Sequence, residues 1–188
     1  MYLTMLPLIF GGIANMIFTK TPIYKKWKKP IDNYKTTKSG KRYLGDNKTW
    51  IGFLSMIIFV AVFQVAFGLL NDILSISHMN DFYAVYDNSI IYNLIVGAAS
   101  GFIYMLFELP NSFIKRRIDI PSGKTVGGFR GVLFFVVDQI DSLIGVMFVL
   151  FLVSNITVWK YFGYVAVGGI THILINLILK SLKIRRNI

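Results

Sequence analysis

Five apolar stretches, each long enough to cross a bilayer as a helix, decide most of what this chain can fold into. They cover residues 2–19, 50–70, 89–107, 131–153 and 161–179. A helix needs roughly 20 apolar residues to span the hydrocarbon core of a membrane. The sequence therefore predicts an all-α integral membrane protein with five transmembrane helices, forming a single membrane domain over residues 1–188.

The composition agrees with a chain that lies mostly in lipid. Hydrophobic residues make up 55% of the chain and charged residues 15%, whereas a soluble domain usually carries about 25% charged residues. The net charge is +11, but the basic residues are confined to a few segments. A nucleic-acid-binding protein would be hydrophilic throughout, so we expect no nucleic-acid partner. The absence of cysteine excludes disulfides, thiolate zinc sites and a cysteine nucleophile.

The positions of the basic residues predict the orientation. Ten of the 20 Lys and Arg lie in the loop 20–49, five in the loop 108–130 and four in the tail from Lys180, which leaves only Lys160 on the other side. Cytoplasmic segments carry such an excess, so we expect both loops and the C-terminus to be cytoplasmic and the N-terminus outside, in a multi-pass protein of the cell membrane. The first stretch lacks a preceding basic segment and a cleavage site, which predicts a retained helix.

Small residues in the third stretch predict a close helix contact. Gly97 and Gly101 form a GxxxG pair, which lets a neighbouring helix approach its backbone closely. The contact is either internal packing or the seam of a homodimer. The two halves of the chain share no repeated motif, so an inverted-repeat transporter is not supported.

Two acidic residues near the cytoplasmic end of the fourth stretch are the strongest chemical feature. Asp138 and Asp141 are three residues apart among apolar neighbours, so both carboxylates lie on one helical face. A carboxylate in a membrane is costly, and two close together repel each other. Because neither neighbouring span offers a charged partner, the pair favours a Mg²⁺ site of hard oxygen ligands. The alternatives are an ion pair with a loop Lys or Arg, or a location among lipid headgroups.

A basic segment follows the third stretch. Pro110 is expected to begin a new helix, on which Ser112, Lys115 and Arg116 would share one face. One hydroxyl and two cations on a face suit a polyphosphate, and the turn 121–128 offers further backbone N–H groups. The alternative is a basic patch for anionic lipid headgroups, which is also the simplest interpretation of the Lys-rich run around Trp27.

Taken in order, these segments resemble the CDP-archaeol synthase family, the CTP:archaeol-phosphate cytidylyltransferases, which are related to the phosphatidate cytidylyltransferases. The matching motifs are Asn15, Pro30-Ile31-Asp32, the run from Gly45 to Gly52, the run from Ser112 to Arg117, and Asp138-Gln139-Ile140-Asp141. The match spans nearly the whole chain. Residue 47 is Asn where relatives tend to carry Gly, and Gln139 replaces an Arg of the phosphatidate branch, which favours the archaeol branch.

The resemblance implies transfer of CMP from CTP to a lipid phosphate, with release of pyrophosphate and with Mg²⁺ as cofactor. The residues that it implies for catalysis are Asp138 and Asp141, which would also bind the metal, together with Lys48 and Lys115. Those that it implies for substrate binding are Asn15, Gly45, Asp46, Thr49, Asn111, Ser112, Arg116 and Arg117.

Three alternatives stay open. The acceptor could be diacyl phosphatidate instead of an archaeol phosphate. A non-catalytic membrane protein that binds anionic lipid would explain the basic loops, but it leaves the acidic pair unexplained. A cation-coupled transporter would use the acidic pair as its ion site.

Overall fold

The computed structural model describes residues 1–124 and 126–182, and the elements of these residues are all helical. The long helices are α1 (Tyr2–Phe18), α3 (Trp50–Ile73), α4 (Ile90–Arg117), α5 (Gly128–Val153) and α6 (Val158–Ser181). The short ones are α2 (Pro22–Trp27) and the 3₁₀ turns η1 (Ser77–Met79) and η2 (Asp81–Tyr83). The prediction of an all-α fold is confirmed. The predicted basic C-terminal tail lies mostly outside the described residues.

Four helices, α3 to α6, are long and apolar enough to cross a membrane. The apolar helix α1 has 17 residues, which corresponds to about 25 Å at the usual rise of an α-helix. A multi-pass membrane protein is therefore supported by these four helices. The fifth span and the orientation remain predictions.

Local sequence signals determine where the helices begin. Thr49, Ser89 and Thr157 each precede a helix in extended conformation, and each hydroxyl accepts a hydrogen bond from the first turn. Such side chains satisfy backbone N–H groups that have no partner within the helix. The three helices α3, α4 and α6 therefore begin within a few residues of the predicted boundaries.

The expected helix break at Pro110 is wrong, because α4 runs without interruption from Ile90 to Arg117 with Pro110 inside it. Proline is tolerated in membrane helices where surrounding groups compensate for the lost backbone bond. As a consequence, Lys115 and Arg116 belong to the same helix as the third apolar stretch.

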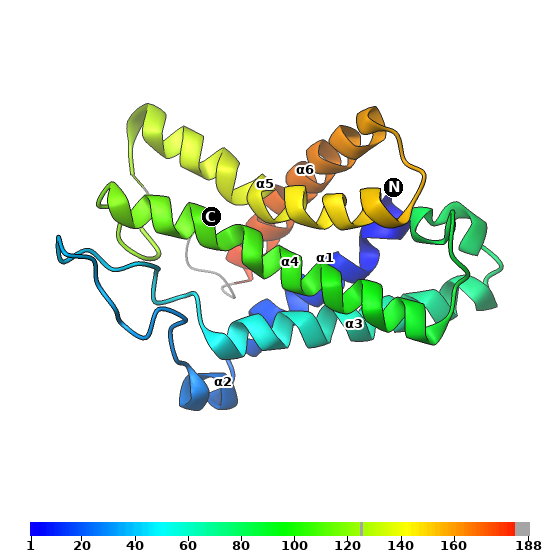
Figure 1. Cartoon of the computed structure of the whole chain (residues 1–188), viewed down its shortest axis with the longest axis horizontal. Coiled ribbons are helices and arrows are strands. Elements are labelled where there is room, and N and C mark those ends of the chain that lie inside the picture. The colour runs from blue at the N-terminus through cyan, green and yellow to red at the C-terminus, as the bar shows by residue number, and fades with distance from the viewer. Residues whose placement is uncertain (125, 183–188) are drawn as a thin grey trace.

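The helices pack in the order α1, α3, α4, α5, α6, and Figure 1 shows α3 and α4 side by side along most of their length. A Cβ atom on Gly97 would lie 2.7 Å from Cα of Ala61, and one on Gly101 would lie 2.7 Å from Cα of Ile57. Both glycines are therefore used for internal packing against α3. These contacts join two helices of one chain and do not form a homodimer seam.

The end of the bundle that carries η1 and η2, here called the distal end, holds a buried network of neutral polar groups. Asn93 Oδ1 accepts hydrogen bonds from Gln64 Nε2 at 3.2 Å and from the Tyr83 hydroxyl at 2.9 Å. Asn93 Nδ2 donates to Asn88 Oδ1 at 2.6 Å. The network joins α3, α4 and the loop between them.

A second distal contact centres on Asp81. Its carboxylate pairs with Lys160 at 2.6 Å and accepts a hydrogen bond from the buried hydroxyl of Tyr164. The Asp81 backbone N–H donates to Thr4 Oγ1 at 3.1 Å. Through this residue the loop between α3 and α4 is fixed to both α6 and α1.

Candidate active site

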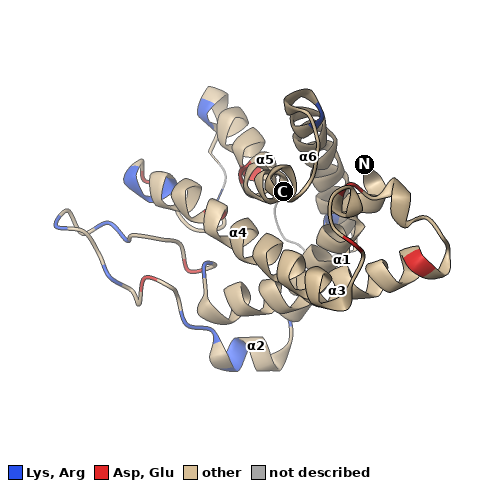
Figure 2. Ribbon diagram, turned by 45° about the vertical axis from the view of Figure 1, so that its right-hand side comes forward, with Lys and Arg blue, Asp and Glu red and all other residues tan. Residues whose placement is uncertain are grey.

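Most of the basic residues that the structure describes gather at the opposite end of the bundle, on α2, along the loop before α3 and at the ends of α4 and α5 (Figure 2). A cavity of about 260 Å³ lies at this end, between α4, α5 and the two basic loops. We call it the polar cavity. Its lining residues are Met16, Gly45, Asn47, Lys48, Tyr104, Glu108, Asn111, Ser112, Lys115, Arg116, Ser122, Gly123, Asp138, Asp141 and His172.

The acidic pair lies in this cavity, one turn apart on α5. A single amide nitrogen, Asn111 Nδ2, donates to Asp138 Oδ1 at 2.6 Å and to Asp141 Oδ2 at 2.8 Å. The two carboxylates therefore converge on one point, as their spacing predicts.

The premise that no neighbouring span offers the pair a cation is wrong. Lys115 Nζ lies 2.5 Å from both carboxylate oxygens of Asp138. Lys115 reaches the pair because α4 continues past Pro110 and brings its last turns alongside α5. The ion pair lines the cavity instead of being sealed away from it, so both partners are accessible to a ligand.

A second ion pair faces the same cavity. Lys48, from the loop that leads into α3, contacts Glu108 of α4, and each side chain is 21% exposed. Glu108 is a residue that the sequence analysis missed. The signal was present, because Glu108, Asn111, Ser112 and Lys115 follow the spacing of one helical face.

The expected shared face of Ser112, Lys115 and Arg116 on α4 lines the polar cavity, and it is tied to both basic loops. Ser112 Oγ accepts a hydrogen bond from Gly45 N at 3.1 Å. Ser122 Oγ accepts from Asp46 N at 2.9 Å and from Arg116 Nη1 at 2.8 Å. A Cβ atom on residue 45 would lie 2.2 Å from Ser122 Oγ, so only glycine permits this approach.

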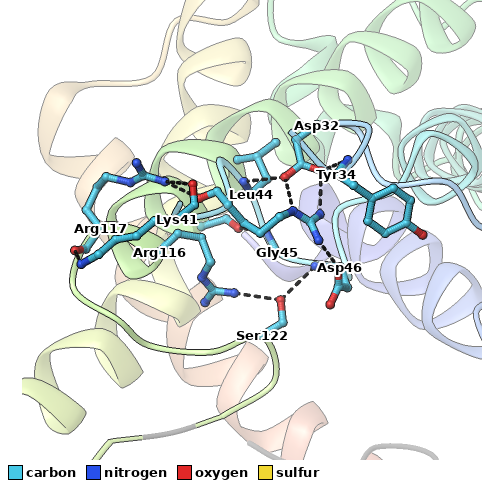
Figure 3. Close-up of polar contacts among 11 residues, drawn as sticks. Asp32, Tyr34, Lys41, Leu44, Gly45, Asp46, Arg116, Arg117 and Ser122 are labelled. Atoms are coloured by element: carbon cyan, nitrogen blue, oxygen red, sulfur yellow. Dashed lines mark hydrogen bonds and ion pairs between the residues drawn. The ribbon is translucent and has the colours of Figure 1, made fainter. Parts of the chain in front are cut away.

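The loop before α3 is held in shape by a clamp between Asp32 and Arg42. Figure 3 shows Asp32 with Leu44 and Asp46 of the same loop. The guanidinium Nη2 lies 2.7 Å from Asp32 Oδ1, and Leu44 N donates to Asp32 Oδ2 at 3.0 Å. Burial raises the pKa of Asp32, but the bonds from Arg42, Leu44 and Tyr34 outweigh it and lower the pKa below its ordinary value of 3.8.

Two residues predicted to bind substrate belong to the structure around this clamp. The Asp46 carboxylate pairs with Arg42 at 2.8 Å. Arg117 donates to the carbonyls of Lys41 and Arg42, and its guanidinium lies 4.7 Å from the ring centroid of Phe113. Neither side chain lines the polar cavity. Arg117 holds the loop against the end of α4, whereas the Asp46 carboxylate pairs within the loop.

Two further predicted ligands also lie outside the cavity lining. Thr49 is fully buried, and its hydroxyl caps α3 and bonds the Tyr24 hydroxyl at 2.9 Å. Asn15 Oδ1 accepts a hydrogen bond from Ser55 Oγ at 2.6 Å. Both polar groups are engaged in joining helices, whereas Met16, next to Asn15, reaches the cavity.

The polar cavity adjoins an apolar cleft between α1, α4, α5 and α6. The cleft is lined by side chains such as Leu8, Ile13 and Ile175, and it shares Met16, Tyr104 and His172 with the polar cavity. His172 Nδ1 lies 3.2 Å from the backbone carbonyl oxygen of Gln139. A molecule with a charged head and an apolar tail could therefore occupy both spaces at once.

The donor set suits a divalent cation that is shared with a phosphorylated ligand. The described residues include no group of three or more His, Cys, Asp and Glu placed to hold a metal alone. Two converging carboxylates, however, are what Mg²⁺ uses when substrate phosphates and water complete its coordination. Asp138 and Asp141 fit that description.

Comparison with known proteins gives a consistent result. Residues 4–187 match a family model described as CarS-like CDP-archaeol synthase. The chain is 29% identical over 153 residues to the CDP-archaeol synthase of Methanococcoides burtonii, covering 76% of each chain. It is 31% identical over 162 residues to that of Methanosarcina mazei, covering 80% of this chain and 84% of the relative.

The fold is also similar to a solved structure described as an intramembrane enzyme for archaeal membrane lipid biosynthesis. The TM-score is 0.63 at 20% sequence identity, with 93% of this chain and 91% of the other covered. At this identity the likeness concerns the fold alone.

Proposed function

This chain belongs to the CDP-archaeol synthase family, and from that premise we propose that it transfers CMP from CTP to a membrane lipid phosphate of the archaeol type. The products are a CDP-lipid and pyrophosphate. The observation that carries the proposal is the junction of the polar cavity, where the acidic pair meets the cations, with an apolar cleft. The two spaces suit the two substrates of such a transferase.

The reaction needs positioning more than acid–base chemistry. An oxygen of the lipid phosphate attacks the α-phosphorus of CTP, a P–O bond forms, and the bond to the oxygen bridging the α- and β-phosphates breaks. Pyrophosphate leaves with the electron pair. Because a phosphate dianion is already a nucleophile, no general base is required. Catalysis of phosphoryl-type transfer comes mainly from alignment and charge stabilisation.

Within the cavity, the cations are placed to bind the nucleotide. Lys48, Lys115 and Arg116 line the cavity and would neutralise the triphosphate and the charge that develops on pyrophosphate. Ser112 would add a neutral hydrogen bond. Asp138 and Asp141 would hold Mg²⁺, which when bound would offset phosphate charge and help to align the reacting groups.

The apolar cleft would take a chain of the lipid acceptor, with its phosphate at the junction formed by Met16, Tyr104 and His172. This arrangement places the acceptor phosphate beside the polar cavity while its tail stays among apolar side chains.

The membrane topology is part of the same proposal. We place α1 across the membrane as a fifth span, with the N-terminus outside and both basic loops in the cytoplasm of a cell-membrane protein. In this orientation 19 of the 20 Lys and Arg lie on the cytoplasmic side, as the excess of basic residues in cytoplasmic segments predicts. It also puts the polar cavity on the side where CTP is available.

The test is a product assay with the purified chain. The protein is incubated with Mg²⁺, with CTP and ATP in equal amounts, and with ether-linked and ester-linked lipid phosphates in equal amounts. We expect mass spectrometry to detect the CDP-ether lipid as the main product. A preparation that is folded and yields no CDP-lipid would refute the proposed activity, and a main product from the ester lipid would reassign the acceptor.

A further inference from the structure

Four of the six charged side chains that line the polar cavity among the described residues form ion pairs with one another. Among the described lining residues there are three carboxylates, Glu108, Asp138 and Asp141, and three cations, Lys48, Lys115 and Arg116. Lys48 pairs with Glu108, and Lys115 pairs with Asp138. The cavity is therefore close to electrically neutral, although the chain as a whole carries +11.

This pairing opposes the binding of a bare polyanion. A metal-free triphosphate must separate each lysine from its carboxylate, and the carboxylates then lie unpaired beside the anion. Like charges placed side by side are strongly unfavourable. A triphosphate that arrives with a divalent cation avoids this cost, because the cation offsets carboxylate charge while the lysines turn to the phosphates.

We infer that Glu108 is a positioning residue that holds Lys48 and makes the cavity select metal-bound CTP over metal-free CTP. The inference rests on the proposed function. Glu108 acts through Lys48 and not on the substrate itself. Its place on α4, one turn before Asn111 and Ser112, puts its carboxylate on the cavity side of the helix, where Lys48 can exchange it for a phosphate.

The two partners of this pair come from different parts of the chain, which makes the exchange feasible. Glu108 belongs to α4, whereas Lys48 lies in the loop just before α3. The two side chains are each 21% exposed, so water can reach the pair and neither charge is locked in a dry interior. A ligand entering the cavity meets both partners directly.

The experiment measures CTP binding by isothermal titration calorimetry, once with Mg²⁺ and once with EDTA. The proteins are the wild type, Glu108→Gln, Glu108→Asp and the control Asp119→Asn. The control removes one negative charge from an exposed ion pair with Lys41 that does not line the cavity. Asn is also tolerated at the positive φ of residue 119.

We expect the wild type to bind CTP at least about tenfold more weakly in EDTA than with Mg²⁺. In EDTA, Glu108→Gln should bind CTP about tenfold more tightly than the wild type does. Glu108→Asp keeps the negative charge and should retain the wild-type preference for metal-bound CTP. Asp119→Asn should bind CTP as the wild type does, both with Mg²⁺ and in EDTA. Thermal unfolding of each variant identifies a folding defect.

The outcomes separate this inference from the proposed function. A wild-type protein that binds Mg²⁺-CTP, with Glu108→Gln showing the same metal dependence as wild type, overturns the role of Glu108 and leaves the enzyme proposal standing. An equal gain in Asp119→Asn also overturns it, since net charge alone would then explain the effect. A folded wild type that binds no CTP even with Mg²⁺ overturns both.

Discussion

The two ends of the helix bundle use polar residues in opposite ways. At the distal end, Gln64 and Asn93 are each 2% exposed and bonded to each other, and the void that Gln64 lines measures about 10 Å³. At the other end, charged side chains surround a cavity of about 260 Å³. Neutral amides are packed beside a very small void at one end, and two ion pairs line an open cavity at the other.

The contrast indicates which polar groups can change partners. Amide and hydroxyl groups that satisfy one another in a packed interior are costly to separate, because each would be left without a partner. Lys48 and Lys115 are paired with carboxylates beside an open cavity, so a phosphate can replace one partner and a metal ion the other. The distal end therefore favours rigidity, and the polar cavity favours exchange of ligands.

The largest effect is expected from the acidic pair. Asp138→Asn and Asp141→Asn should each lower CDP-lipid formation by about a thousandfold, since the loss of metal-based charge stabilisation is worth several kcal/mol. The rate of product formation and the unfolding temperature are measured together. Product that persists in both variants, with the fold intact, would reject the metal role and weaken the contrast between the two ends.

At the distal end the expected loss is in stability instead. Tyr164→Phe removes the hydroxyl that bonds Asp81 and should lower the free energy of unfolding by about 1–3 kcal/mol, because a hydrogen bond to a partly buried carboxylate is lost. Turnover below the unfolding temperature should not change. The exposed Tyr86 provides the control Tyr86→Phe. If Tyr164→Phe lowered turnover in a fully folded protein, the distal end would not be purely structural.

A matched pair of charge-preserving changes compares the two ends directly. Lys48→Arg should lower kcat/KM for CTP about tenfold, since a planar guanidinium does not replace an ammonium in a shaped phosphate site. Lys160→Arg, in the distal ion pair with Asp81, should leave kcat/KM unchanged. Equal tolerance of both changes would instead favour a surface patch that only attracts anionic lipid.

The smallest effect is a pH dependence of the loop before α3. Because the folded pKa of Asp32 lies below its ordinary value of 3.8, its stabilising contribution is present above the ordinary pKa and is lost as the pH falls through the folded pKa. Limited proteolysis should find this loop equally protected from pH 7 to about 5 and less protected under stronger acid. Asp32→Asn should lose protection already at pH 7. Unchanged protection in that variant would show that the clamp does not hold the loop.

Features that depend on local periodicity could be predicted from the sequence. Apolar length predicted the long helices, and the spacing of Asp138 and Asp141 predicted a shared face. The Ser112, Lys115 and Arg116 face also follows from helical spacing alone. In each case the information lies within a few turns of one helix.

Features that depend on packing could not be predicted in this way. Thr49 adjoins Lys48 in sequence, but its hydroxyl caps α3 while Lys48 reaches the cavity. Ser122 and His172 enter the cavity only because the loop before α5 and the helix α6 lie against other elements. Pro110 was expected to interrupt a helix because proline lacks a backbone N–H, yet the surrounding bundle keeps α4 continuous.

The continuity of α4 also relates the reaction to the thickness of the membrane. Its 28 residues extend about 42 Å, whereas the hydrocarbon layer is about 30 Å thick. The same rigid rod that crosses the lipid therefore projects beyond it and carries Glu108 and Lys115 at its emerging end. A change in the tilt of such a rod is one way to adapt to a thinner or thicker bilayer, and tilting it moves the charged side chains at this end toward or away from the lipid surface.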